Sequence, residues 1–141
     1  MNAQLLRESL DRAKKENGGI DALGIRFYNR LFEQYPSVRP MFPEKMEAQA
    51  SKLMAAVAWI VANVENAEVF KPYVEEMAVR HLQYGTLEAH YPAVGENLLA
   101  VLEEHLSVEG DFSAETKAAW AGAYGAIQFI MIEKAYPKEA V

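Results

Sequence analysis

The segment FKPYVEEMAVRHLQYGTLEAHY, residues 70–91, decides how the rest of this chain is interpreted. Apolar side chains recur in it at steps of three and four residues, which places His81 in the middle of one apolar helical face. That face consists of Phe70, Val74, Met77, His81 and Tyr84. Gly85 ends the helical run, and Pro92 is expected in the first turn of the next helix, where proline is tolerated. A buried imidazole needs a partner, so the pattern predicts that His81 is bonded to a specific group.

The rest of the chain shows the apolar periodicity of further helices. We expect helices at about residues 3–16, 20–35, 44–63, 67–84, 91–106 and 113–133, with a short turn at 37–41 after Pro36. No segment alternates with period two for long enough to form a strand, so the fold class is all-α. Six to seven helices of unequal length, a proline corner and a lone histidine fit a globin architecture better than a four-helix bundle. Gly24, in the middle of a buried helical face, predicts a close helix crossing at Ala50.

Length and composition exclude several kinds of function. The 141 residues suit one core, and we expect a single globin domain over residues 1–141. A net charge of −6 without a basic cluster argues against nucleic acids and anionic membrane surfaces as partners. The absence of cysteine excludes disulfides, thiolate metal sites and cofactors attached through thioethers. The first 17 residues do not form a signal pattern and no apolar run reaches membrane-spanning length, which predicts a cytoplasmic protein.

The residues that suggest chemistry are ordinary when each is taken alone. His81 by itself would more often be a hydrogen-bonded core histidine than a metal ligand. The ordinary interpretations of the others are a buried tyrosine for Tyr28, core filler after a proline corner for Phe42, a residue at the boundary of the apolar face for Gln49, and a solvated residue near a helix end for Glu133. As a set, however, they fall on helical faces that must meet in one core. The pattern becomes specific only when these residues are taken as a set.

The chain resembles the bacterial single-domain haemoglobins, which are similar to the haem domain of flavohaemoglobins. The resemblance extends from about Phe27 to Glu133 without large gaps. The segments that carry it are Phe27-Tyr28, Tyr35-Pro36, Pro40-Met41-Phe42, Gln49 with Leu53, Arg80-His81, Gln83-Tyr84-Gly85, His90-Tyr91-Pro92-Ala93-Val94-Gly95, Ala119-Trp120, Ala123-Tyr124-Gly125 and Ile132-Glu133. It implies a globin fold around a haem pocket, with a short or absent helix between the corner and the distal helix.

Carried over residue by residue, the resemblance implies a haem b group held without a covalent bond. His81 looks like the proximal ligand of the iron, through Nε2, and Phe42 looks like the corner phenylalanine that packs on the porphyrin. Tyr28, Gln49 and Leu53 match the distal residues. Tyr28 would donate a hydrogen bond to the gas ligand, Gln49 would support it and Leu53 would limit access.

On the proximal side, Tyr91 and Glu133 match a pair in which the tyrosine holds the glutamate and the glutamate accepts from Nδ1 of His81. A carboxylate acceptor makes the histidine a stronger electron donor to iron, as in peroxidase-like sites. Neither His90 nor His105 is well placed to reach the iron, so both are expected at the surface or the rim. Further haem contacts are expected from Met77, Val94 and Lys52. The lysine would reach a propionate, and an ordinary solvated lysine is an equally good interpretation.

Two functions of different classes follow from the resemblance. The first is reversible, high-affinity binding of O2, with NO and CO as further ligands, for oxygen delivery or storage. The second is an enzyme, nitric oxide dioxygenase, which converts NO to nitrate; peroxidase-like activity belongs to the same class. The 141 residues hold no G-x-G-x-x-G segment and no flavin or nicotinamide domain, so turnover would need a separate NAD(P)H-dependent reductase. A sensor would need an output domain for which this length leaves no room.

Overall fold

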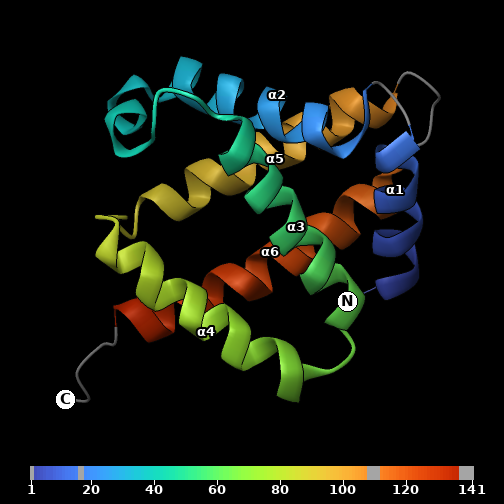
Figure 1. The fold of residues 1–141 in the computed structure, drawn as a ribbon. Coiled ribbons are helices and arrows are strands. Elements are labelled where there is room, and N and C mark those ends of the chain that lie inside the picture. The colour runs from blue at the N-terminus through green and yellow to red at the C-terminus, as the bar shows by residue number, and fades with distance from the viewer. Residues whose placement is uncertain (1, 16–17, 108–111, 137–141) are drawn as a thin grey trace.

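The computed structural model of the chain describes residues 2–15, 18–107 and 112–136 (Figure 1). Within this part, the elements are α1 (Ala3–Lys15), α2 (Gly19–Gln34), η1 (Pro36–Met41), α3 (Glu47–Asn63), α4 (Ala67–Gln83), α5 (His90–Ser107) and α6 (Ala114–Ala135). Here η1 is a 3-10 helix and the other six are α-helices. The described residues include no strand, and no helix lies between the corner at Phe42 and α3. The predicted fold class is therefore confirmed.

Local chemistry explains several of the helix ends. The side-chain oxygen of Asn2 accepts a hydrogen bond of 3.2 Å from the amide of Leu5, and Ser113 Oγ accepts one of 3.1 Å from the amide of Thr116. Both residues cap free N–H groups in the first turn of a helix. Gly85 has a φ of 87°, a left-handed conformation that glycine adopts without strain and that ends the run after α4.

The helices pack in two crossing groups. Figure 1 shows α2 and α5 packed against each other at the top, with α3 leading down from α2, while α4 crosses α6 near the C-terminal end of α6. At the crossing of α2 and α3, a Cβ atom placed on Gly24 would lie 3.0 Å from the carbonyl oxygen of Ala50 and 3.1 Å from its Cβ. The predicted close approach of Gly24 and Ala50 is confirmed. None of the described helices combines the length and apolarity that crossing a membrane requires.

Two details of the sequence prediction are wrong. The distal helix begins at Glu47 and not near residue 44, because the side chain of Arg39 bonds to the carbonyl groups of residues 42–44 and holds them outside a helix. Tyr84 is 66% exposed, although it continues the apolar spacing of the His81 face. It lies at the C-cap of α4, where the backbone leaves the helix before Gly85, so the helical spacing no longer determines its direction.

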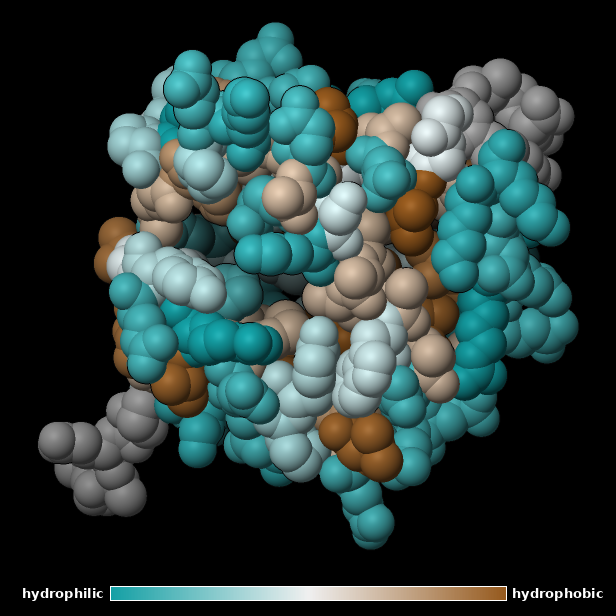
Figure 2. Space-filling model, in the orientation of Figure 1, coloured by the Kyte–Doolittle hydropathy of each residue, from teal (hydrophilic) through white to brown (hydrophobic). Residues whose placement is uncertain are grey.

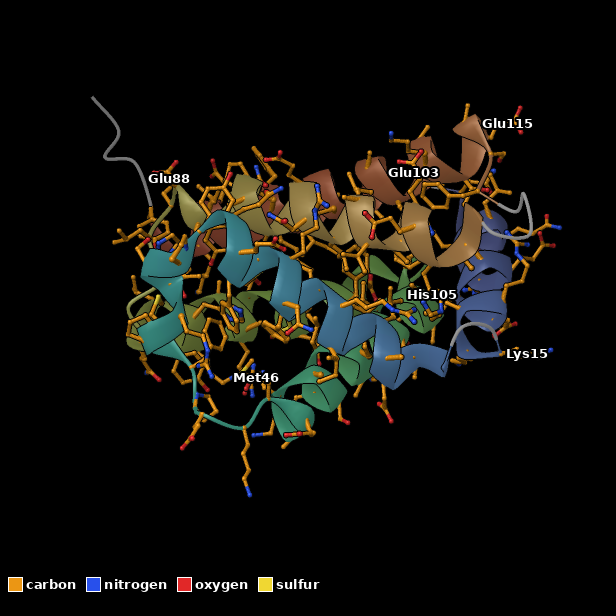
Figure 3. The ribbon with its side chains drawn as sticks, turned by 90° about the horizontal axis from the view of Figure 1, so that it is seen from above. Lys15, Met46, Glu88, Glu103, His105 and Glu115 are labelled. Carbon is orange, nitrogen blue, oxygen red and sulfur yellow. The ribbon has the colours of Figure 1, made fainter. Side chains whose placement is uncertain are left out.

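His105 is a core residue and not a surface or rim residue, which corrects a third expectation. It is 1% exposed, its Nε2 lies 3.0 Å from the carbonyl oxygen of Ala13, and its Nδ1 lies 2.7 Å from Nη1 of Arg26. A carbonyl can only accept and a guanidinium can only donate, so the proton is on Nε2 and the ring is neutral. His105 thereby ties α5 to α1 and α2 (Figure 3). His90 is half-buried, and its Nδ1 accepts from the amide of Leu87 at 3.0 Å beside the start of α5.

Candidate functional site

Tyr28 and Gln49 meet across the contact between α2 and α3. Tyr28 is 5% exposed, and the amide nitrogen of Gln49 lies 3.3 Å from its phenolic oxygen. Because the amide donates this hydrogen bond, the oxygen of Tyr28 is the acceptor and its own proton remains available to another group. Burial raises the pKa of Tyr28, while the hydrogen bond from Gln49 lowers it by less. The tyrosine is therefore a protonated donor at neutral pH.

Aromatic rings surround the donor. The ring centroid of Tyr28 lies 5.3 Å from that of Phe42 and 5.8 Å from that of Phe32, and the two phenylalanine centroids lie 5.3 Å apart. Phe27 adds an edge contact to Tyr28 at 4.9 Å. The structure thus brings the predicted residue Phe42 to Tyr28. It also adds Phe32, which the sequence offered only as one more apolar position on a helical face.

His81 has one ring nitrogen fixed by the backbone. Its Nδ1 lies 2.7 Å from the carbonyl oxygen of Met77, one turn earlier in α4. Since the carbonyl can only accept, Nδ1 carries the proton and Nε2 holds a free lone pair in the neutral ring. Burial lowers the pKa of His81, and the charge of Arg80 lowers it further, against an opposing effect of the Met77 hydrogen bond. A neutral imidazole with a free Nε2 is the form that binds a metal ion.

The structure does not form the proximal hydrogen bonds expected for Tyr91 and Glu133. Met77, and not Glu133, provides the acceptor for Nδ1 of His81. Glu133 is exposed and lines a surface pocket between α4 and α6 together with Lys71, Glu75, Phe129, Ile130 and Lys134. Tyr91 is 5% exposed, and its buried hydroxyl has no hydrogen-bond partner in the described part of the chain. The difference arises because Glu133 lies in the last turns of α6 and turns toward solvent beside Phe129.

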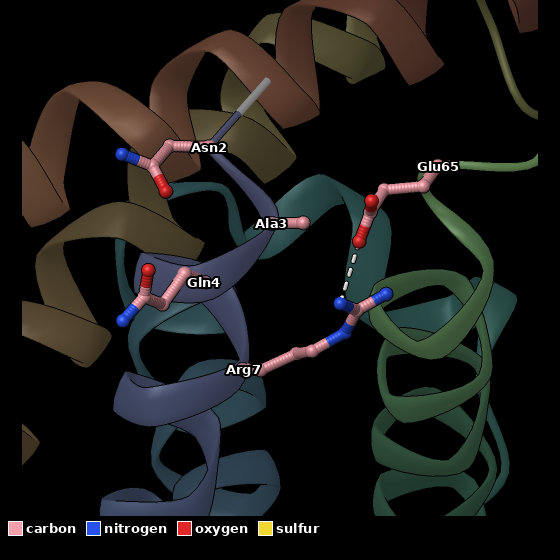
Figure 4. A pocket seen from close by; sticks show the side chains of 5 residues that line it. All are labelled: Asn2, Ala3, Gln4, Arg7 and Glu65. Atoms are coloured by element: carbon pink, nitrogen blue, oxygen red, sulfur yellow. Dashed lines mark hydrogen bonds and ion pairs between the residues drawn. The ribbon is translucent and has the colours of Figure 1, made fainter.

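The remaining candidates divide between the interior and the surface. Leu53, Met77 and Val94 are half-buried and pack against the core, whereas Lys52 is exposed. Figure 2 shows a hollow on the face of the molecule between α3 and α4, bordered by hydrophilic side chains. A different pocket lies at the N-terminal end of α1, where Arg7 and Glu65 form an ion pair of 2.6 Å (Figure 4). Neither Tyr28 nor His81 lines that pocket.

A contact between Tyr124 and the backbone of Tyr91 was not expected from the sequence. The hydroxyl of Tyr124 donates to the backbone carbonyl of Tyr91, which joins α6 to the first turn of α5. The ring of Tyr124 lies directly against Gly95, where a Cβ atom would clash with it. Both residues fall within the segments that carry the resemblance, but spacing alone gives no sign that they touch. The pair fixes the backbone that presents Tyr91.

Sequence comparison finds related proteins over most of the chain. Flavohemoproteins from Bordetella parapertussis and Rhizobium meliloti are 34% and 36% identical to the chain over 121 and 110 residues. These matches cover 84% and 74% of the chain but only 29% and 26% of the two relatives, so the chain spans less than a third of their length.

Two solved structures have a similar fold. A bacterial globin from Campylobacter jejuni has a TM-score of 0.79 and 29% identity, and the match covers 94% of this chain and 93% of that one. A Rhodothermus marinus protein, described as an engineered carbene transferase and a proposed nitric oxide dioxygenase, has a TM-score of 0.80 and 28% identity. That match covers 94% of this chain and 89% of the other. The family model for globins matches residues 25–131, which is well over half of the sequence, and the chain therefore belongs to the globin family.

Proposed function

We propose that the protein binds haem b without a covalent bond and uses it for reversible, high-affinity binding of dioxygen. The observation that carries the proposal is the hydrogen bond from Gln49 to Tyr28. It places a buried, protonated phenol with an uncommitted proton beside Phe42, the residue expected to contact a porphyrin. Haem supplies an iron atom that binds small gases such as O2, NO and CO, and the protein residues decide which gas is favoured.

The residues present fit a haem group. His81 offers a neutral Nε2 with a free lone pair, which suits a metal whose other ligands come from a porphyrin. Leu53, Met77, Phe42 and Val94 supply half-buried apolar surface, as a porphyrin ring requires. The hydroxyl of Tyr91 is a further buried polar atom, and the described residues provide no hydrogen-bond partner for it. Haem binding is also what membership of the globin family implies.

The distal side favours dioxygen over carbon monoxide. A dioxygen ligand held on ferrous haem would carry partial negative charge, and a phenol that donates to it would contribute about 1–3 kcal/mol. Carbon monoxide takes on little charge and gains less from the donor. Gln49 keeps the phenol oriented, and burial keeps it protonated. Tyr28 is therefore the residue assigned to slow the release of oxygen.

The proximal side favours binding over redox chemistry. The carbonyl oxygen of Met77 is a neutral acceptor. Its hydrogen bond with Nδ1–H of His81 is therefore weaker than a bond to a carboxylate would be, and it polarises the ring less. The histidine then donates less electron density than in peroxidase-like sites. This contact argues for oxygen binding or delivery as the first function.

A second candidate is nitric oxide dioxygenase activity with a separate reductase. The specific observations in its favour are the flavohemoprotein relatives and the Rhodothermus marinus structure, whose description proposes that activity. In this reading Tyr28 would hold dioxygen for reaction with NO, and an NAD(P)H-dependent reductase would return the iron to the ferrous state. The oxygen-binding site is common to both functions.

Visible spectra of the purified protein in the ferric, ferrous and CO-bound forms test the proposal. We expect a haem spectrum with one histidine ligand, and we expect His81→Gly to lose haem or its normal spectrum unless imidazole is added. The matched control is His90→Gly, since the ring of His90 bonds to the backbone of Leu87. A His81→Gly protein that keeps an unchanged ferrous spectrum without imidazole would contradict the ligand assignment.

A further inference from the structure

Arg39 makes three hydrogen bonds to successive backbone carbonyl groups. Its Nη1 lies 3.2 Å from the oxygen of Phe42 and 2.9 Å from that of Pro43, and its Nη2 lies 2.9 Å from that of Glu44. The guanidinium presents five N–H donors in a planar fork, so one side chain can reach all three oxygens. A lysine carries its donors on one nitrogen atom, so it cannot span three successive carbonyl oxygens in this way.

These carbonyls belong to the link between η1 and α3, residues 42–46, which has no helical structure. Figure 3 shows this link as a thin coil segment that ends near Met46, just before α3. In the described part of the chain, no backbone N–H donates to the oxygens of Phe42, Pro43 or Glu44. The amide of Phe42 donates to the carbonyl oxygen of Arg39 at 3.1 Å, and the carbonyl oxygen of Met46 accepts from the amide of Ala50 at 2.8 Å. Between these two ends, the hydrogen bonds that hold the carbonyl groups of the link come from the side chain of Arg39, which helps to fix the backbone at Phe42.

The same guanidinium also stacks on the aromatic cluster. Its central carbon lies 4.9 Å from the ring centroid of Phe32, a cation–π contact. Phe32 in turn lies beside Phe42 and Tyr28, at centroid distances of 5.3 Å and 5.8 Å. Arg39 thus contacts both phenylalanines that flank Tyr28, one through its ring and one through its backbone.

We propose that Arg39 is a positioning residue of the distal pocket, which fixes Phe42 and the ring of Tyr28; the proposal rests on the oxygen-binding function given above. A hydrogen bond weakens steeply when its length or angle departs from the favoured range. The hydroxyl of Tyr28 can stabilise the gas ligand only if it lies within hydrogen-bond distance of that ligand and at a suitable angle. Arg39 touches neither ligand nor haem in this assignment and acts through the rings of Phe32 and Phe42.

The test combines a measurement on the haem-free chain with one on the haem-loaded chain. Arg39→Met keeps the aliphatic stem and removes all donors, and Arg39→Lys keeps the charge and removes the fork. The matched control is Lys45→Gln, because Lys45 lies in the same link, is exposed, and makes no hydrogen bond or ion pair in the described part of the chain. Backbone amide hydrogen exchange is followed by mass spectrometry in the haem-free chain, and off-rates of O2 and CO are measured in the loaded protein.

For Arg39→Met we expect amide exchange in residues 44–49 to speed up by roughly tenfold, with α5 and α6 unchanged. The O2 off-rate should rise by about three- to tenfold and the CO off-rate by less than about twofold. Arg39→Lys should behave like Arg39→Met, whereas Lys45→Gln should match the native protein.

The proposal is overturned if exchange in residues 44–49 is unchanged, or if it is equally fast in Lys45→Gln. It is also overturned if exchange rises evenly in all helices, which would mark Arg39 as a general stabiliser. Native amide exchange and native off-rates in Arg39→Lys would also overturn it, because a positive charge without the three guanidinium hydrogen bonds would then suffice. If the native chain takes up no haem, the proposed function is wrong. The exchange measurement would still decide whether Arg39 fixes the backbone of residues 42–46.

Discussion

Gln49 donates its amide hydrogen to the phenolic oxygen of Tyr28 over 3.3 Å, and this bond joins α3 to α2. The direction of the bond matters more than its strength. A tyrosine oxygen that accepts from Gln49 keeps its own proton for a third group. The hydrogen bond from Gln49 therefore orients the phenol of Tyr28 and leaves its proton free to be donated.

The first prediction concerns that proton. Tyr28→Phe should raise the O2 off-rate by about 10- to 100-fold, because about 1–3 kcal/mol of hydrogen bonding to a partly charged ligand is lost. The CO off-rate should change far less, since CO carries little charge when bound. Stopped-flow or flash-photolysis measurements of both gases check this. Equal changes for O2 and CO would mean that Tyr28 acts through its bulk.

Gln49→Leu serves as the control for this first prediction. Loss of the Gln49 amide should raise the O2 off-rate by only about 2- to 10-fold, because one neutral hydrogen bond contributes about 0.5–1.5 kcal/mol. Combined with Tyr28→Phe it should add nothing further, since the acceptor oxygen is then absent. Additive effects in the double variant would show that Gln49 contacts the ligand independently.

The second prediction compares two helical glycines. At Gly24 a methyl group would meet Ala50 and the Cγ of Met54 at 3.0–3.1 Å, whereas at Gly122 a Cβ would have no neighbour within 4 Å. We expect Gly24→Ala to lower the free energy of unfolding by about 1–3 kcal/mol through overpacking. Gly122→Ala should raise it by about 0.5–1 kcal/mol, the ordinary gain in a helix. Urea denaturation gives both values, and stabilisation by Gly24→Ala would mean that α2 and α3 do not cross this closely.

Much of the fold could be predicted because it follows from local rules. The spacing of apolar residues determined the helices, and Gly24 in a buried face indicated the crossing at Ala50. The meeting of Tyr28 and Gln49 was predicted as well, since each lies on a face that has to reach the core. These inferences need only helical geometry and the burial of apolar surface.

What could not be predicted depends on contacts between residues far apart in the chain. His105 is buried because Ala13 and Arg26, on two other helices, satisfy both ring nitrogens, and no periodicity in α5 shows this. The acceptor for His81 is a backbone carbonyl, which carries no sequence signal at all. Arg39 is similar, because its three acceptors are backbone oxygens.

The third prediction concerns the buried hydroxyl of Tyr91, which has no partner among the described residues. Burial raises the pKa of Tyr91 to about 12, so the group stays neutral at all ordinary pH values. Tyr91→Phe should raise the unfolding free energy of the haem-free protein by about 1 kcal/mol, because an unsatisfied polar atom is removed. Tyr124→Phe is the matched comparison. It should lower the same quantity by about 1–2 kcal/mol, because the carbonyl of Tyr91 loses a side-chain donor that joins α6 to α5.

Both values come from urea titrations of haem-free protein at neutral pH. Destabilisation of similar size in the two variants would show that the Tyr91 hydroxyl has a partner after all. In that case Tyr91 would support the protein fold before any cofactor is bound.

The last prediction separates a carrier from an enzyme and concerns Glu133. Nδ1 of His81 donates to the carbonyl of Met77, and Glu133 is exposed beside Glu75. Glu133→Gln should therefore change the ferric/ferrous potential by less than about 30 mV, and no more than Glu75→Gln does. If Glu133 were the acceptor, the loss of its charge would weaken electron donation to ferric iron and raise the potential by about 60 mV or more, roughly 1.4 kcal/mol. Spectroelectrochemical titration of the three proteins decides between these values.

Nitric oxide consumption then extends the same comparison to turnover. Under air, with a supplied reductase and reduced nicotinamide, a carrier should remove NO in one stoichiometric burst. Glu133→Gln should leave that burst unchanged, because oxygen binding depends on Tyr28 and Gln49 at the distal side. Sustained consumption that slows in Glu133→Gln but not in Glu75→Gln, together with a raised potential, would mean that Glu133 reaches His81 in the haem-loaded protein. The proximal pair would then act in catalysis, and nitric oxide dioxygenase would replace oxygen binding as the function of this chain.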